Sequence, residues 1–152
     1  MRNIILICCL VFLSSCGYTS IYKNQKTQDF QINIIQMTGD KELNNLIKNE
    51  IGLYSNLNSN IKYDISIESK YEKIIISKNS SGVATDFKIL ANTKVKVNIN
   101  NETKNLEFNE KINIKNSSNS FEQKKYERNI KGSFASSIRE KIFIKIFNLN
   151  GY

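Results

Sequence analysis

Apolar and polar residues alternate in three successive segments in the middle of the chain, and this pattern constrains the fold more than any other feature of the sequence. Successive side chains of a β-strand point to opposite faces of a sheet, so each segment predicts a strand with one buried and one solvated face. Polar turns at Asn79–Gly82 and Asn100–Asn101 separate the segments, which predicts an antiparallel meander. The expected buried face comprises Tyr63, Ile65, Ile67 and Tyr71, then Phe87, Ile89, Ala91, Thr93, Val95, Val97 and Ile99, and finally Leu106, Phe108, Ile112 and Ile114.

One further strand and two helices flank the meander. The apolar, β-branched run Phe30–Met37 predicts a strand, and Asp40 is expected to cap the helix that follows it. Ser120 and Gln123 match a capping box at the start of a long helix that ends near Phe147. The apolar face of the first helix comprises Leu43, Leu46, Ile47, Ile51 and Tyr54, and that of the second Tyr126, Ile130, Phe134, Ala135, Ile138, Ile142, Phe143 and Ile146.

The predicted order of elements is β-α-β-β-β-α, which corresponds to an α+β fold. We expect a two-layer sandwich: one four-stranded mixed sheet with two helices packed on one face. The alternation breaks down at Ile74–Ile76, where a bulge is possible. The other face of the sheet is polar and free for water or a partner.

The N-terminal residues match an export signal. Ile4–Leu13 is apolar and follows Arg2, but it is shorter than the about 20 residues that span a bilayer. It runs into Leu13-Ser14-Ser15-Cys16, an order that resembles the lipobox of bacterial lipoproteins, in which the cysteine is acylated and becomes the new N-terminus. The alternative is an ordinary secretory peptide with an accidental cysteine.

The lipobox sets the expected domain organisation. Residues 1–15 form a lipoprotein signal peptide, residues 16–29 a lipidated tether, and residues 30–152 a single domain. Gly17, rather than Asp, follows Cys16, and by resemblance to lipoprotein sorting rules this favours the outer membrane over the inner one. We therefore expect a protein held by its lipid chains on the periplasmic side of the outer membrane.

The residues that remain after this cleavage restrict the possible chemistry. The chain has no histidine, which excludes Ser-His, Cys-His and histidine–metal arrangements. The two other cysteines leave with the signal peptide, so no free thiol is expected in the mature chain. Glu102, Glu107 and Glu110 are scattered, and the last two point to opposite faces of their strand. We expect no catalytic residues, no metal site, no cofactor and no enzymatic activity.

The formal charge of +8 admits two interpretations. A basic protein can bind nucleic acid, phospholipid or an anionic glycolipid. Alternatively, the charge follows from composition, because the chain is rich in Lys, Asn and Ile and contains no His, Pro or Trp. Export removes nucleic acid as a partner in either case.

The residues around the lipobox carry a resemblance to one family. Leu13 to Tyr22 (LSSCGYTSIY) is similar to the start of the LPS-assembly lipoprotein LptE, also called rare lipoprotein B, in which Cys-Gly-aromatic is followed by a small residue or proline, an aliphatic residue and Tyr. Ser20 stands where proline is common. The predicted order of elements and the long final helix resemble the rest of that family, although outside the lipobox these are patterns and not sharp motifs.

The resemblance implies an interaction protein. LptE-like proteins sit inside the outer-membrane β-barrel LptD as a plug and assembly partner, and they contact lipopolysaccharide on its way to the outer leaflet. Four lysines on the polar strand faces would then contribute to a patch for the lipid A phosphates, namely Lys94, Lys96, Lys111 and Lys115. The simpler interpretation of these lysines is a solvated sheet face in a lysine-rich protein.

Two other function classes remain open at this stage. One is a solitary outer-membrane lipoprotein that binds an anionic or apolar lipid without a barrel partner. The other is a substrate-specific hydrolase, which would require a clustered polar pocket. A plug should be found in complex with a barrel, whereas a solitary binder should purify alone with ligand in its core.

Overall fold

The computed structural model describes residues 30–99 and 102–149. The expected signal peptide and tether, including Cys16, therefore lie outside the described residues. The elements follow the predicted order: β1 (Phe30–Gly39), α2 (Lys41–Tyr54), β2 (Ile61–Lys78), β3 (Ala84–Ile99), β4 (Glu102–Lys115) and α3 (Ser120–Leu149).

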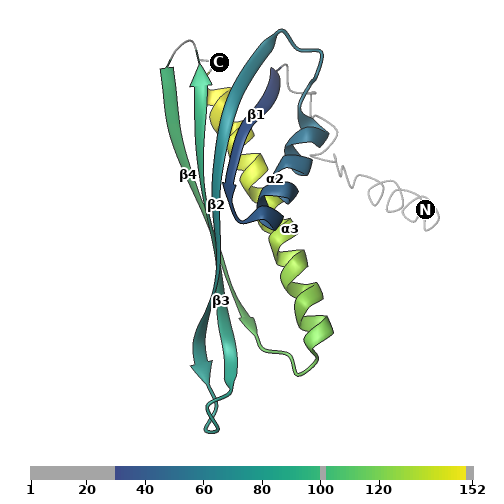
Figure 1. Ribbon diagram of the computed structural model, residues 1–152, viewed down its shortest axis with the longest axis vertical. Coiled ribbons are helices and arrows are strands. Elements are labelled where there is room, and N and C mark those ends of the chain that lie inside the picture. Colours follow the sequence, from purple (N-terminus) through teal and green to yellow (C-terminus); the bar gives the residue numbers. More distant parts are fainter. Residues whose placement is uncertain (1–29, 100–101, 150–152) are drawn as a thin grey trace, which may run out of the picture.

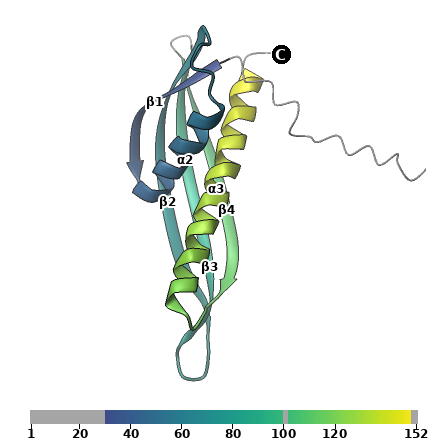
Figure 2. The same cartoon turned by 90° about the vertical axis from the view of Figure 1, so that its right-hand side faces the viewer.

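The four strands form one mixed sheet in the order β1-β2-β3-β4. β1 is parallel to β2, whereas β2, β3 and β4 pair antiparallel as the predicted meander. Both helices lie on the same face of the sheet, so the molecule is the expected two-layer α+β sandwich (Figure 2). The alternation in the sequence does not reveal the strand order. A two-residue repeat is the same whether a strand pairs parallel or antiparallel, and whichever strand it joins.

The core lies between the helices and one face of the sheet. Its apolar side chains come from all six elements, and those at the centre, among them Ile65, Val97 and Ile138, have no exposed surface. Phe30 contacts both the neighbouring strand and the last helix. Its ring makes an edge contact with Tyr63 of β2 and a tilted contact with Phe143 of α3, each with a centroid separation of 5.5 Å. The first strand thus packs directly against the last helix.

The sheet is longer than the layer that covers it. β1 and α2 occupy only one half of its length, α3 alone covers much of the other half, and the β2–β3 hairpin extends beyond the end of α3 (Figure 1). At the far end the β2–β3 hairpin closes at Asn79–Gly82 as predicted, with Gly82 at φ +79° and with the Asn79 side chain accepting from the N–H groups of Ser81 and Val83. Ile75 and Ser77 flank a register shift, which confirms the bulge predicted near Ile74–Ile76.

Three local predictions need correction. β1 continues to Gly39, two residues beyond Met37, because Thr38 and Gly39 still pair with Glu68 and Ser69. The capping residue of α3 is Asn119, whose side chain accepts from the N–H groups of Phe121 and Glu122, so Ser120 is already inside the helix. Three residues assigned to buried or apolar faces are exposed, since Tyr126 exposes 48% and Tyr54 and Ile112 each expose 37% of their surface.

Gly39 and Asp40 connect β1 to α2, and their backbone lies close against the backbone of β2 at Ser69. The Asp40 N–H donates to the carbonyl oxygen of Ser69 at 3.0 Å, and the Asp40 carboxylate accepts from the Leu43 N–H at 2.8 Å, which is the predicted cap. Asn44 donates from its amide to the carbonyl oxygen of Thr38 at 2.8 Å. These bonds fix the direction in which α2 leaves the sheet.

In the described part of the chain no helix is both long enough and apolar enough to cross a membrane. α3 has the length, with 30 residues, but charged side chains interrupt it throughout.

We predict that Gly39→Ala strongly destabilises the domain. Gly39 has φ +94°, and an added Cβ would lie 1.8 Å from the backbone oxygen of Ser69, so β1 or β2 must move. The expected loss is at least about 3 kcal/mol in the free energy of unfolding, measured by urea denaturation. Gly52→Ala is the matched control: it lies in α2 with no atom near the added Cβ, and it should raise stability by up to about 1 kcal/mol. Equal effects of the two substitutions would contradict this account of Gly39.

Candidate functional site

The face of the sheet opposite the helices, called here the open face, carries the candidate site. Strand register places the odd-numbered side chains of β4 and the even-numbered side chains of β3 on this face, because their neighbours point into the core. The polar residues that the sequence analysis assigned to one face all lie on it: Lys88, Asn92, Lys94, Lys96, Asn109, Lys111, Asn113 and Lys115.

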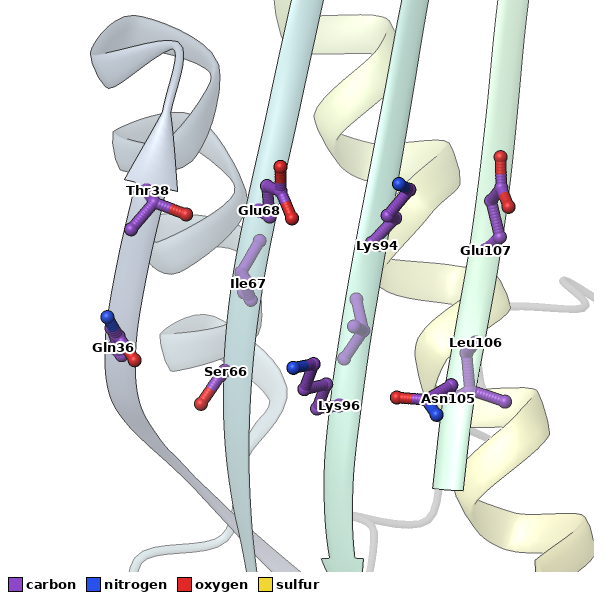
Figure 3. A pocket seen from close by; sticks show the side chains of 11 residues that line it. Gln36, Thr38, Ser66, Ile67, Glu68, Lys94, Lys96, Asn105, Leu106 and Glu107 are labelled. Atoms are coloured by element: carbon purple, nitrogen blue, oxygen red, sulfur yellow. The ribbon is translucent and has the colours of Figure 1, made fainter. Parts of the chain in front are cut away.

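A shallow hollow of about 400 Å³ lies on the open face where all four strands run side by side. Figure 3 views it from the side away from the helices, with β1 on the left and β4 on the right. Its polar lining combines hydrogen-bond donors and acceptors: Gln36, Thr38, Ser66, Glu68, Lys94, Lys96, Asn105 and Glu107. Apolar atoms also contribute to the lining, including those of Ile67, Val95 and Leu106, so the hollow suits a charged or polar group that carries an apolar part.

Two of the four predicted lysines lie in this hollow, but their surroundings differ. Lys94 lies opposite Glu68 on β2 and Glu107 on β4, so a carboxylate flanks it on each side. Lys96 lies opposite the neutral side chains of Ser66 and Asn105. Lys96 therefore attracts an incoming anion more strongly than Lys94, whose charge the two carboxylates offset.

The other two predicted lysines lie further along β4. Lys111 is opposite Leu90 and, with Lys88, lines a separate shallow depression. Lys115 is opposite Asp86. Since Glu107 and Lys111 are four residues apart, the Lys111 position lies about 14 Å along the sheet from that of Lys94. The four lysines thus share one face but form two separate groups.

Asp86 is stabilised as a carboxylate beside Lys115. Hydrogen bonds from the hydroxyl groups of Ser77 and Thr85 lower the pKa of Asp86, and the charge of Lys115 adds to this effect. Asp86 is therefore charged at neutral pH and offsets the charge of Lys115. Of the four lysines, Lys96 and Lys111 are the two without a carboxylate directly opposite.

The open face as a whole carries both signs of charge. Its lysines are interleaved with five carboxylates, of which Glu68, Glu107 and Asp86 lie directly opposite a lysine, whereas Asp64 and Glu72 lie opposite Asn98 and Leu90. Asn92 connects two positions of β4 by donating to Glu107 and to Asn109, each at 2.6 Å. This mixture agrees with a broadly polar surface better than with a single basic patch.

The helix side contains a second charged cluster that the sequence analysis did not identify. The Lys131 ammonium group lies 2.7 Å from Glu42 and 3.5 Å from Asp40, and 4.3 Å from the centre of the Tyr71 ring. Burial, together with the charges of Glu127, Asp40 and Glu42, raises the pKa of Tyr71 to about 12. These groups brace α3 against α2, and their charges are mutually compensated.

Glu107 and Glu110 point to opposite faces of β4, as predicted. Glu107 faces the open side, whereas Glu110 faces the helices and accepts hydrogen bonds from Ser137 and Lys141 of α3. Among residues 30–99 and 102–149 there is no group of three acidic side chains arranged to hold a metal ion.

Comparison with known proteins establishes the fold. No protein-family profile matches the sequence, and no curated protein matches it. The crystal structure of the rare lipoprotein B from Shewanella oneidensis is similar, with a TM-score of 0.57 and 14% identity over 78% of this chain and 99% of that one. The chain has the fold of rare lipoprotein B.

Two further solved structures have the same fold. A putative lipoprotein from Caulobacter crescentus CB15 matches with a TM-score of 0.51 and 9% identity over 78% of this chain and 88% of that chain. An uncharacterized lipoprotein B from Nitrosomonas europaea matches with a TM-score of 0.51 and 13% identity over 76% and 83%. The fold expected from the resemblance is thus confirmed, although identities this low carry the fold alone.

We predict that the four lysines contribute unequally to the binding of an anionic ligand, with lipopolysaccharide, which the resemblance implies, as the probe. Lys96→Gln with Lys111→Gln should weaken the affinity of the purified protein about 3- to 10-fold, because each residue lacks an opposing carboxylate. Lys94→Gln with Lys115→Gln removes the same charge but should change affinity less than about twofold. Titration at two salt concentrations measures both variants, and the larger effect should shrink at high salt. Unchanged binding with all four lysines replaced would exclude a role for this set.

Proposed function

We propose that this protein is an outer-membrane lipoprotein of the LptE family, which plugs the LptD β-barrel, assists its assembly and acts in lipopolysaccharide transport to the outer leaflet. The observation that carries the proposal is the open face: a long sheet surface, polar along its length, with no part of residues 30–99 or 102–149 packed on it. The fold of rare lipoprotein B supports the family assignment.

The chemistry of the open face suits the interior of a barrel. The lumen of an outer-membrane barrel is polar, and its outward apolar band is about 25 Å tall. β2 and β3 contain 18 and 16 residues, which at about 3.4 Å per residue correspond to more than 50 Å. The sheet is therefore long enough to line a barrel over its full height.

The tether has a suitable reach. Cys16 and Phe30 are about 14 residues apart, and an extended chain of that length spans at most about 50 Å. A lipid-anchored Cys16 in the inner leaflet of the outer membrane thus allows the domain to occupy a neighbouring barrel. Two or more acyl chains would make this anchoring durable.

Contact with lipopolysaccharide would involve the lysines of the open face. Lys96 and Lys111 provide separated positive groups on the open face that suit separated phosphates. The carboxylates between them limit the strength of any single contact. We expect lipopolysaccharide to be guided by this surface and not held in a deep site.

The solitary lipid-binding alternative has support only in part. If the ligand is apolar, this alternative requires a cavity in the core, but the residues at the centre of the core have no exposed surface, and the hollow on the open face is shallow with charged side chains in its lining. If the ligand is anionic, this alternative would use Lys96 and Lys111.

We also propose a non-catalytic role, because the chain has no histidine and the Glu110 side chain accepts a hydrogen bond from Ser137 of α3.

The deciding experiment is purification of the full-length protein from native envelopes in mild detergent, with mass spectrometry of what is recovered with it. We predict a single large β-barrel protein at near-equal amount. A Cys16→Ala variant should lack the increase in mass that lipidation causes, and it should no longer be found in the membrane fraction. Recovery of the lipoprotein alone, while other envelope complexes survive, would contradict the plug and favour the solitary binder.

A further inference from the structure

β4 is an edge strand along its whole length. In the described part of the chain it pairs only with β3, and no strand lies on its other side (Figure 1). Just after β4, the Asn116 N–H donates to the carbonyl oxygen of Thr85, so even-numbered residues direct their backbone groups towards β3. Backbone groups alternate in direction along an antiparallel strand. The odd-numbered residues of β4 therefore direct their N–H and C=O groups to the free side, where another strand could pair with them.

Among the described strands, β4 offers the longest regular edge. It runs for 14 residues with no register shift against β3. β1, at the other edge of the sheet, has 10 residues and a register shift between Ile34 and Gln36. The part of β2 that extends beyond β1, after Ser69, contains two register shifts after Ile75. A transmembrane β-strand has about 9 to 11 residues, so β4 can accommodate one at full length.

The two sides of the β4 edge differ in polarity. On the open face every side chain of the strand is polar, from Thr103 to Lys115 in steps of two. On the helix side Ile112 of β4 exposes 37% of its surface and Ile144 of α3 exposes 52%. Ile144 is seven residues after Ser137 and so lies on the same side of α3. Ser137 donates to Glu110 of β4 at 2.8 Å, so this side of α3 faces β4.

The exposed apolar residues of the helix side, together with the partly buried Leu106, are called here the apolar strip: Leu106, Ile112 and Ile144. Glu110 is the one charged side chain of β4 on the helix side between Leu106 and Ile114, and α3 holds it. Its carboxylate accepts hydrogen bonds from Ser137 and Lys141, and its side chain exposes only 15%. A strand placed beside β4 would thus meet a paired carboxylate there and not a free charge.

The polarity of the β4 edge matches that of a barrel strand. Strands of outer-membrane barrels alternate apolar side chains, which face lipid, with polar side chains, which face the lumen. Before insertion into the membrane, the apolar side chains of such a strand are exposed to water, which is unfavourable. Along β4 the strand would form backbone hydrogen bonds, direct its polar side chains to the open face and place its apolar side chains against the apolar strip.

We propose that β4 binds one unassembled strand of the partner barrel by β-strand addition and releases it when the barrel strands pair with one another. This step rests on the proposed function, to which it adds the site and the mode of contact during barrel assembly. One copy of the chain serves one barrel. The bound strand leaves β4 before the barrel closes around the domain, so the step is compatible with the plug.

Photo-crosslinking in pulse-labelled cells tests the site. Ile112→p-benzoylphenylalanine in the full-length, lipidated protein should give an adduct with newly made chains of the barrel that co-purifies with the protein. During the chase this adduct should fall at least about fivefold, because the strand leaves β4 as the barrel assembles. The control is the same analogue at Lys94, which lies on the open face of a strand that is not at an edge. Its adduct with the barrel should persist in the assembled complex.

Proline substitution separates backbone pairing from side-chain contact. Asn109→Pro removes an N–H that faces the free side of β4, so it should block strand addition but keep the hydrogen bonds with β3. We expect it to reduce the Ile112 adduct at least about fivefold and to delay barrel assembly. Asn109→Ala loses the same side chain but keeps the N–H, and it should change neither. Thermal melting verifies that each variant folds, and Asn113→Pro repeats the test if Asn109→Pro does not.

The outcomes separate strand addition from the proposed function. Equal effects of proline and alanine at position 109 would overturn strand addition, and so would an Ile112 adduct that persists through the chase as the Lys94 adduct does. A barrel that co-purifies with the protein but never crosslinks at Ile112 would overturn strand addition alone. Absence of a barrel from both the co-purification and the Lys94 adduct would overturn the proposed function, and strand addition with it.

Discussion

Packing of the two helices against one face of the sheet is the constraint on which the rest of the structure depends. Ile138, Ile142 and Ile146 of α3 lose all of their exposed surface against the sheet and α2. Burial of an aliphatic side chain of this size contributes about 2 kcal/mol, so these three residues together contribute an amount comparable with the net stability of a typical domain. Because both helices occupy the same side, the other side needs no apolar residues and is available for a polar surface.

Much of this architecture was predictable because it follows from local periodicity. Alternation in β3 assigned Val95 and Val97 to the core and Lys94 and Lys96 to solvent, and the structure confirms both assignments. The Asp40 cap and the Asn79–Gly82 turn were also predictable, because side-chain hydrogen bonding to the local backbone defines them. Exposure at the margins of the core was not predictable: Ile112 follows the apolar pattern but lies on the edge strand β4, and Tyr54 follows it at the last residue of α2.

The candidate site was predictable only as a set of residues on one face. Which carboxylate opposes which lysine depends on strand register, and register depends on bulges and turn lengths that a single sequence does not fix. The difference between Lys96, opposite Ser66, and Lys94, opposite Glu68, therefore required the structure. The same reason explains why the Lys131, Tyr71 and Glu42 cluster was missed, since its members are distant in sequence and meet only between α2, α3 and β2.

The contact of Phe30 with Phe143 has a consequence for how the chain acquires its structure. The first described residue closes the core against a helix near the end of the chain, more than a hundred residues later, and β1 cannot join the sheet before β2 is present. Contacts at such sequence separation are made late and slowly, because the whole intervening loop must first be ordered. A chain that has not yet acquired its last helix therefore cannot close the core at Phe30, however much of the sheet has already formed.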